Sequence, residues 1–391
     1  GKTMSVISDL KDLHVTWLDL AYPYMLAYVS KDKYNVFGEQ DLYISSDLGK
    51  TFVKAIIPTN TNDQDQSSFI VATVQDDVIF LIKDSYPTDN FEESQEDDHF
   101  VFKITQKTYI SDSSGIKFAG LDEATKHLTS TDTSDYFTFA ARLFNFKGVL
   151  TLSKMKFDFM DQKDNEESMK FYLIPGFISF DDGNTWEKFN LKNDEDFSCN
   201  PETGSNCNLR LEYGSSEFVS QTQDVSVDDR LMTPGIASIK GIVSDSDVME
   251  AAAVEKNTMT FITRDFGKSW EKAFDHSVNF AYGDYGNIIV GVHNDPNIDG
   301  DFIQEFYYSL DQGKTWEEYE LKEEDGKDGL LFWSEIKPLV LDGSGFQFIA
   351  SAYKVDGSDI NTDYHYIIDF TEVFDKKSCG NDDIEITKLN G

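Results

Sequence analysis

The sequence predicts an all-β protein, a β-propeller of about six four-stranded blades. Three observations lead to this prediction. A short turn motif recurs along the chain, each copy follows a β-rich run, and aromatic residues make up 14% of the 391 residues, with 31 Phe and 18 Tyr. This aromatic content suits stacked sheets better than a helical bundle, and the chain is long enough for a large core.

The recurring motif reads Ser/Thr-x-Asp-x-Gly-x-Thr/Ser-aromatic, which is the pattern of an Asp-box hairpin. The Asp carboxylate and the hydroxyls can bond the turn's own backbone N–H groups, the Gly supplies a positive φ, and the aromatic ring packs the turn onto its sheet. One copy would be weak evidence, but four copies that agree this well are strong. The full copies occupy residues 45–52 (Asp47, Gly49), 179–186 (Asp181, Gly183, Trp186), 263–270 (Asp265, Gly267, Trp270) and 309–316 (Asp311, Gly313, Trp316).

Two weaker copies extend the series. Residues 111–118 keep Gly115 and the aromatic Phe118 but lack the Asp at the third position. A truncated copy, Gly1-Lys2-Thr3, opens the chain, so we expect the chain to be a fragment of a longer protein.

The spacing of the motif glycines sets the number of blades. The shortest spacings, such as that from Gly267 to Gly313, match one four-stranded blade of roughly 40 to 50 residues, and the longer ones imply loop insertions. After Gly313, strand-like runs at 346–353 and 364–370 continue without a motif. We therefore expect five blades that end in a full or degenerate box and a last blade without one.

The charge of the chain favours some partners over others. Its formal net charge is −37, from 71 acidic and 34 basic residues. This argues against nucleic acid and anionic membrane surfaces, because the field would repel phosphates, and favours basic peptides or proteins. The alternative is that the charge serves solubility alone. The sequence contains no run of about 18 apolar residues, so it predicts neither a membrane span nor a signal peptide. The chain could still be the luminal segment of an anchored protein.

The cysteines indicate an oxidising compartment. Cys199 and Cys207 lie in one polar loop between strand-like sequences. A small-loop disulfide is favoured there over two free thiols or a partial metal site, and it implies an oxidising lumen. Cys379 is left over, which suggests a partner outside the chain.

The order of these motifs resembles the sortilin family, especially its yeast-type receptors that sort soluble vacuolar hydrolases. The matching pieces run over nearly the whole chain. They are the box at 179–186 with the paired-Cys loop and residues 208–212 after it, residues 233–236, the box at 263–270, residues 282–290, residues 305–316, and residues 366–370 leading to Cys379.

The resemblance implies a ten-bladed propeller with a wide central tunnel, followed by a Cys-rich module, on a type I membrane receptor that cycles between Golgi and endosome. Residues 1–375 would then be blades from the C-terminal part of the propeller, and residues 376–391 the start of the Cys-rich module. In the family, the cysteine that matches Cys379 pairs back to the first blade, and Cys199 to Cys207 matches a family disulfide. The implied location is the lumen of the Golgi, endosome or vacuole.

The resemblance also suggests where a ligand would bind. In animal members an Arg on the strand entering one box, five residues before the box Ser, clasps the terminal carboxylate of a peptide inside the tunnel. That position is Gln40 here. A neutral amide supplies no charge, and a charge-assisted hydrogen bond is roughly twice as strong as a neutral one. Gln40 and the nearby Tyr28, Leu42 and Phe69 are our predicted ligand-binding residues; the alternative is that these side chains pack a blade's inner edge.

The alternative interpretation of the same boxes is a sialidase, but the residues that a sialidase needs are not found in the expected pattern. Its six-bladed ring needs three Arg for a carboxylate, a Tyr/Glu nucleophile pair and an acidic residue. Arg264 falls in a box turn, and the Arg-Ile-Pro signature is replaced by Leu173-Ile174-Pro175. The chain has only four arginines, Arg142, Arg210, Arg230 and Arg264.

Other chemistry is equally unsupported by the sequence. The six histidines form no His-Glu-x-x-His pair, and there is no Gly-x-Ser-x-Gly elbow. We interpret them as surface or blade residues; the alternative is that some titrate in an acidic endosome and weaken ligand binding. Residues 295–301 match the opening of a calcium loop, but the twelfth position is Phe306 rather than Glu, which favours a plain acidic turn. We expect no cofactor and no metal.

The sequence therefore predicts a binding protein rather than an enzyme: the luminal ligand-binding region of a sorting receptor for soluble vacuolar hydrolases or propeptides with basic surfaces. A truncated remnant without receptor function is the alternative, and a sialidase-like glycosidase is less favoured.

Overall fold

In the computed structural model, the secondary structure of the described residues consists mainly of antiparallel strands, which confirms the all-β prediction. It forms two compact units: unit 1 comprises Gly1–Arg142, Lys147–Lys188 and Phe218–Ser226, and unit 2 comprises Leu143–Phe146, Phe189–Glu217 and Val227–Gly391. The structure describes residues 7–31, 39–58, 66–75, 78–86, 105–121, 137–142, 148–159, 169–192, 197, 207–211, 233–246, 248–293, 305–321, 330–340, 344–356, 359–375 and 385–389.

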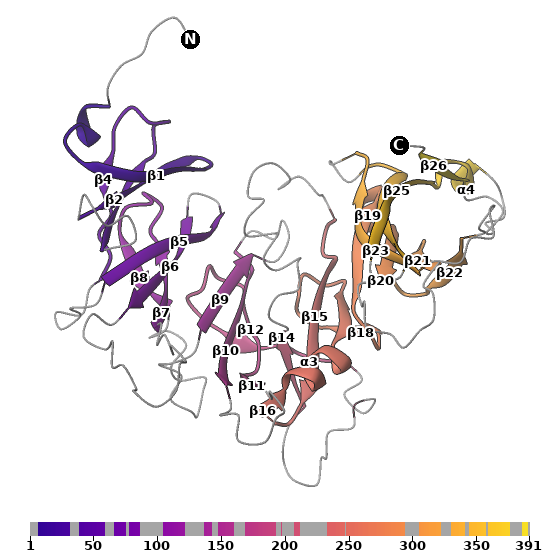
Figure 1. The fold of residues 1–391 in the computed structure, drawn as a ribbon. Coiled ribbons are helices and arrows are strands. Elements are labelled where there is room, and N and C mark those ends of the chain that lie inside the picture. Colours follow the sequence, from indigo (N-terminus) through magenta and orange to yellow (C-terminus); the bar gives the residue numbers. More distant parts are fainter. Residues whose placement is uncertain are drawn as a thin grey trace, which may run out of the picture. The chain divides into compact units, whose positions relative to one another are not determined.

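Unit 1 begins with a short 3-10 helix, η1 (Ser8–Leu10), and a four-stranded meander in chain order (Figure 1). Its strands are β1 (His14–Ala21), β2 (Tyr24–Ser30), β3 (Gln40–Ser45) and β4 (Val53–Lys54). The second meander consists of β5 (Gln66–Gln75), β6 (Val78–Tyr86), β7 (Thr105–Ser111) and β8 (Phe118–Gly120). The two sheets share a core in which Leu26, Leu42 and Ile44 are buried with Ile79 and Leu81.

The third sheet of unit 1 is centred on one long strand, β10, which pairs with β9 along one side and with β11 and β12 along the other. Its strands are β9 (Phe137–Arg142), β10 (Leu150–Phe159), β11 (Met169–Leu173), β12 (Phe177–Ser179) and β13 (Glu187–Lys188). Leu150, Leu152 and Phe177 from this sheet pack with Phe80 of the second sheet.

Unit 2 holds three sheets. The first has β14 (Asn208–Leu211), β15 (Ala237–Ser244), β17 (Met259–Thr263) and β18 (Glu271–Phe274), with β16 (Val248–Glu250) and α3 (Ala251–Asn257) in the connection between β15 and β17. The second has β19 (Val278–Gly283), η5 (Asp284–Gly286), β20 (Ile288–His293), β21 (Glu305–Ser309) and β22 (Glu317–Glu320). The last has β23 (Leu330–Pro338), β24 (Gln347–Asp356), β25 (Asp359–Asp369), α4 (Thr371–Asp375) and β26 (Glu385–Leu389).

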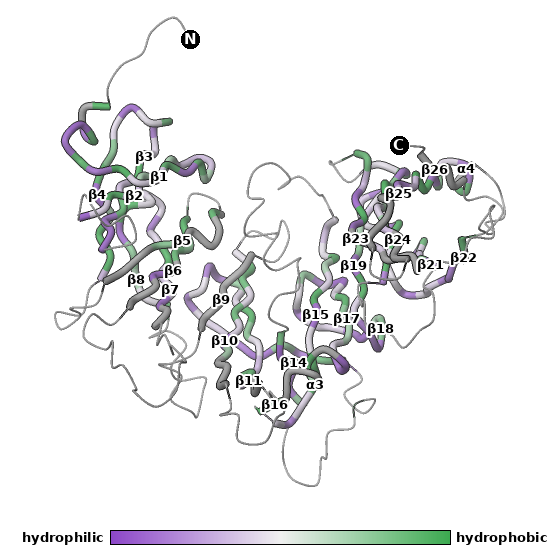
Figure 2. The backbone as a smooth tube through the Cα atoms, in the orientation of Figure 1, coloured by the Kyte–Doolittle hydropathy of each residue, from purple (hydrophilic) through white to green (hydrophobic). Residues whose placement is uncertain are grey.

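Burial differs between the strands of one sheet in a way that the sequence explains. All six residues of β20, Ile288 to His293, are buried, because the strand lies between β19 and β21 and is covered on both faces. The outer strand β22, whose sequence is Glu-Glu-Tyr-Glu, is largely exposed, as suits an edge that must not pair with another chain. Figure 2 shows hydrophobic and hydrophilic residues interspersed along the described strands.

The last sheet differs from the others in its final connection. No box follows β25; the short helix α4 comes instead, with Phe370 and Val373 buried in the sheet's core. Strand β26 then pairs with β25, with Ile368 opposite Ile386. Strand β26 lies in the segment 376–391, which the sequence analysis assigned to the start of the Cys-rich module, and that division stays a prediction.

Candidate ligand-binding site and the repeated turns

The four box turns share one set of hydrogen bonds. In the turn after β12, the Ser179 hydroxyl accepts the Gly183 N–H at 2.9 Å and donates to Asp181 Oδ1 at 2.9 Å. Asp181 Oδ1 also accepts the Thr185 N–H at 2.8 Å, and its Oδ2 accepts the Thr185 hydroxyl at 2.7 Å. The equivalent bonds begin at Ser45, Thr263 and Ser309, with distances from 2.5 to 2.9 Å.

The backbone of these turns contains two left-handed residues in succession. The glycine has a positive φ, for example 83° at Gly183, and the residue before it does as well, with 57° at Asp182. The sequence analysis assigned this conformation to the glycine alone. The preceding residues in the other three boxes are Leu48, Phe266 and Gln312.

The box carboxylates are held in their charged form by the turns. At Asp47 the backbone N–H and hydroxyl of Thr51, with the Ser45 hydroxyl, hold the pKa well below its usual range. At Asp181 burial raises the pKa, but bonds from Thr185 and Ser179 outweigh it and the net shift is downward. Because these oxygens are bonded inside the turn, the carboxylates are structural groups.

The aromatic residue locks each turn to its sheet. The Trp186 indole donates to the Gly183 carbonyl at 2.9 Å, and the Trp270 indole donates to the Gly267 carbonyl at 3.0 Å. Trp316 instead stacks on Phe280, with ring centroids 5.0 Å apart and planes at 14°. The tips of the turns stay accessible and are not uniformly polar, since Leu48 and Phe266 are exposed there.

The predicted ligand-binding residues lie on β2, β3 and β5. Gln40 is the first residue of β3 and pairs with Ser30, while Leu42 pairs with Tyr28. Tyr28 and Leu42 are buried, with exposed fractions of 7% and 1%, and Phe69 packs against the same core cluster. The placement of these three apolar residues supports the packing alternative, and their ligand-binding role stays a prediction.

Charged residues next to Gln40 are already paired with one another. Lys31 forms an ion pair with Glu39, and Lys54 Nζ lies 2.6 Å from Asp41 Oδ2. The Asp41 carboxylate also lies 3.8 Å from Lys31 Nζ. The positive charges of both lysines are thus partly offset by Glu39 and Asp41, and the role of Gln40 stays a prediction.

The remaining predicted sites fall partly outside the described residues. Cys207 is disulfide-bonded, whereas Cys199, Cys379 and residues 295–301 lie outside the described part of the chain. Among the described residues, no group of three or more His, Cys, Asp or Glu side chains could hold a metal ion. Within the same residues, no helix is long and apolar enough to cross a membrane.

Two of the four arginines, Arg210 and Arg264, have structural partners among the described residues. Arg264 pairs with Glu271 and donates to the Gly313 carbonyl at 3.1 Å. Arg210 is buried and its Nε donates to the Ser246 carbonyl at 2.9 Å. The Arg142 side chain and Arg230 lie outside what the structure describes.

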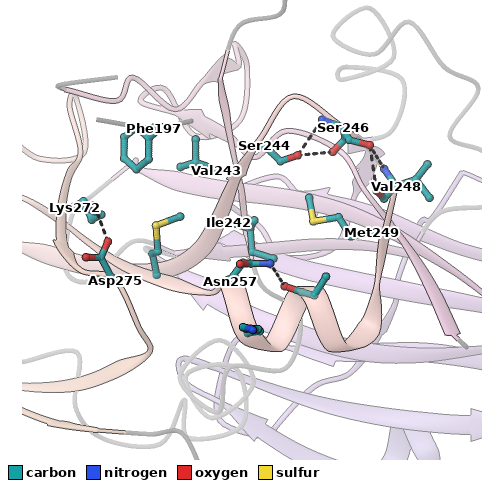
Figure 3. A pocket seen from close by; sticks show the side chains of 13 residues that line it. Phe197, Ile242, Val243, Ser244, Ser246, Val248, Met249, Asn257, Lys272 and Asp275 are labelled. Atoms are coloured by element: carbon teal, nitrogen blue, oxygen red, sulfur yellow. Dashed lines mark hydrogen bonds and ion pairs between the residues drawn. The ribbon is translucent and has the colours of Figure 1, made fainter. Parts of the chain in front are cut away.

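A pocket that the sequence analysis missed lies in unit 2, around β15, α3 and the start of β17 (Figure 3). Its volume is about 640 Å³. Its lining combines apolar side chains with Lys256, Lys272 and Asp275. The motif series could not reveal it, because the lining residues lie on strands and on a connection outside the repeated turns.

Comparisons with known proteins give the chain its family. The profile of the Sortilin-Vps10 family, described as sortilin, neurotensin receptor 3, matches residues 23–327. The vacuolar protein sorting/targeting protein 10 of Zygosaccharomyces rouxii is 31% identical over 398 residues, covering all of this chain and 22% of that protein. The vacuolar protein sorting/targeting protein PEP1 of Saccharomyces cerevisiae is 29% identical over 390 residues, again covering 22% of its length.

The chain thus spans about a fifth of the length of these curated relatives. Among solved structures, a Trypanosoma rangeli sialidase resembles it with a TM-score of 0.29 and 14% identity, over 88% of this chain and 53% of that one. A score this low carries no argument about function. The family profile covers more than half of the chain, and the chain therefore belongs to the Sortilin-Vps10 family, a family of receptors and not of enzymes.

Proposed function

We propose that the chain is the luminal ligand-binding region of a Vps10-type sorting receptor in the Golgi and endosome, where it captures soluble vacuolar hydrolases or their propeptides without chemistry. The observation that carries this proposal is the match to the Sortilin-Vps10 family over residues 23–327. The names of the yeast relatives, which refer to vacuolar protein sorting, supply the transport role.

The architecture that goes with this function is a set of propeller blades from a ten-bladed ring. Support comes from the repeated meanders, in which a box turn joins the third strand to the fourth, as from β3 to β4 and from β21 to β22. Function in such folds lies on loops and strand edges rather than in the packed sheets.

The charges support binding of basic cargo. With a formal charge of −37, the chain attracts basic protein surfaces and accelerates their encounter. Gln40, beside lysines that are already paired, offers little to a terminal carboxylate. Cargo would accordingly be recognised through folded or basic surfaces.

The test is a pull-down of luminal proteins on the immobilised chain at pH 7, with elution near pH 5. We expect enrichment of hydrolase precursors at neutral pH. Absence of any enriched hydrolase or propeptide would contradict the proposal.

The carboxylate prediction has a separate test. Gln40→Arg should raise the affinity for a peptide with a free C-terminus by about 1 to 2 kcal/mol, the scale of a hydrogen bond to a charged group, and leave its amidated form unchanged. Titration calorimetry with both peptides measures this. An equal gain in affinity for the two peptides, or no gain, would contradict the assignment of Gln40 to the ligand-binding site.

A further inference from the structure

Two histidine rings are stacked in unit 2 where its first and second sheets share a core. His276 lies in the connection between β18 and β19, and His293 is the last residue of β20. Their ring centroids are 4.3 Å apart, with the ring planes at 12°. His293 is 6% exposed, and His276 Nε2 is shielded from solvent as well. The two imidazoles therefore pack like aromatic core side chains between two sheets.

The stack is one of the contacts that hold this connection in place. The Thr260 hydroxyl of β17 donates to the His276 carbonyl at 2.7 Å and accepts the Val278 N–H at 2.9 Å. The centroid of the His276 ring also lies 5.4 Å from that of Phe274 and 5.7 Å from that of Tyr307. Movement of His276 would accordingly loosen the link between the two sheets.

Carboxyl groups of the second sheet lie beside the stack. The register of β20 and β21 places Glu305 opposite His293, and that of β21 and β22 places Glu320 opposite Glu305. The Tyr307 hydroxyl lies 3.5 Å from Glu305 Oε1. A hydrogen bond with Glu318, together with burial, raises the pKa of Glu305 to about 7. Carboxylates next to an imidazole favour its protonated form, so these strands draw a proton toward His293.

The other charged groups around the stack come from the first sheet and from the connection itself. Asp275, the neighbour of His276 in the chain, is exposed and lies 2.6 Å from Lys272 Nζ, measured from its Oδ1. Lys240 of β15 is buried, and its Nζ donates to Asn279 Oδ1 of β19 across the two sheets. Residues 294–304 lie outside the described part of the chain. A buried lysine in this interface opposes a second positive charge in the stack.

Two protonated imidazoles cannot stay stacked at this distance without a large cost, because like charges a few ångströms apart repel each other. Histidine takes up its proton between about pH 5 and 8, so both rings come into question as a solution becomes acidic. Separation of the rings relieves the repulsion and leaves His293 beside Glu305. His276 is the ring that can move, since it lies in a connection, whereas His293 belongs to a strand that is buried throughout.

We propose that the His276–His293 stack is an acid-operated switch in the connection between these two sheets. The rings are stacked at neutral pH; when both are protonated, His293 pairs with Glu305 and His276 leaves the interface. The change is local, because the stacked rings of Phe280 and Trp316 continue to join the turn to its sheet. The switch needs no ligand, so it does not rest on the proposed receptor function.

The experiment is hydrogen–deuterium exchange of the whole 391-residue chain at pH 7.4 and pH 5.5, corrected for the intrinsic effect of pH on amide exchange. Amides of residues 275–280 should exchange about tenfold faster at pH 5.5, the effect of a difference of one pKa unit between stacked and separated rings. His276→Phe keeps an aromatic ring in the stack but cannot take up a proton, so it should remove this acceleration. His365→Gln, which replaces a histidine of the last sheet, should leave the acceleration unchanged.

Three results of this experiment would overturn the switch. They are the absence of acceleration in the unaltered chain, an equal acceleration in His276→Phe, and loss of the acceleration in His365→Gln.

A second measurement decides the question if His276→Phe does not fold, as judged by circular dichroism. Nuclear magnetic resonance of the unaltered chain with labelled histidine follows the six histidine rings through a pH titration. Two of them should titrate together in coupled steps and, by pH 5.5, lose the shifts that each ring imposes on the other. Independent titration of all six rings, or stacking shifts that persist at pH 5.5, would overturn the proposal.

Discussion

The full box after β12 and the degenerate turn after β7 reverse the chain with different bonds. In the full box, Asp181 stands two residues after Ser179 and gathers the N–H and hydroxyl of Thr185. In the degenerate turn, Asp112 directly follows the serine, and its Oδ1 accepts the Ser114 N–H at 3.1 Å and the Ser114 hydroxyl at 2.5 Å. What the turn requires is a carboxylate inside it, and that carboxylate can come from a neighbouring position.

The serines of the two turns also differ. Ser179 bonds within its own turn, whereas the Ser111 hydroxyl accepts the Ile79 N–H of the neighbouring strand at 2.7 Å. The degenerate turn therefore exchanges one internal bond for a contact with its sheet.

The glycines differ even more, and they lead to the largest predicted effect. A Cβ on Gly115 would lie 2.6 Å from Tyr24 Cε1, whereas one on Gly183 would meet nothing closer than 3.4 Å. Gly115→Ala should lower the free energy of unfolding by about 3 kcal/mol, from left-handed strain plus overpacking. Gly183→Ala should cost only about 1 to 2 kcal/mol, from the strain alone. Urea titration of the intact chain measures both, and equal losses would contradict the packing difference.

The carboxylates provide the next comparison. Asp181→Ala should destabilise the chain by about 2 kcal/mol, because a backbone N–H and two hydroxyls lose a charged partner. Asp112→Ala should cost about 1 kcal/mol, since its Lys117 contact is long at 3.4 Å and the Ser111 contact with Ile79 remains. A larger loss for Asp112→Ala would mean that the degenerate turn depends on its carboxylate more than the full box does.

The pH dependence separates the box turns from a carboxyl pair in unit 2. The lowered pKa values of Asp181, Asp265 and Asp311 make a contribution to stability that is present above about pH 4, the unfolded range, and is lost as the pH falls further. Glu305 behaves oppositely: its bond with Glu318 and burial raise its pKa to about 7.

Because folded Glu305 holds a proton that the unfolded chain releases, stability should rise as the pH falls from about 7 to about 4.5. Discounted for solvent exposure, this gain is about 1 kcal/mol, the smallest effect predicted. Thermal unfolding at several pH values measures it. Glu305→Gln should flatten the profile in this window, and the exposed Glu187→Gln should not; identical profiles for all three chains would contradict the assignment.

Much of the repeat could be predicted from sequence, because each box fixes a turn between two strands. Asp112 was missed, since the motif was matched by position and the carboxylate stands one residue further from the glycine than in the full boxes. The sequence analysis did not predict β16 and α3, because the connection that contains them is short and carries no periodic pattern. The roles of Tyr28 and Leu42 could not be separated either, as a core and a binding surface both call for apolar residues.

The receptor claim is tested most directly by the affinity of the intact chain for a purified precursor of a soluble vacuolar hydrolase. Biolayer interferometry at pH 7 should show saturable binding that weakens with added salt, as expected for basic cargo on an acidic surface. A neutral or acidic control protein should not bind. No saturable binding of any hydrolase precursor at pH 7 would contradict the account.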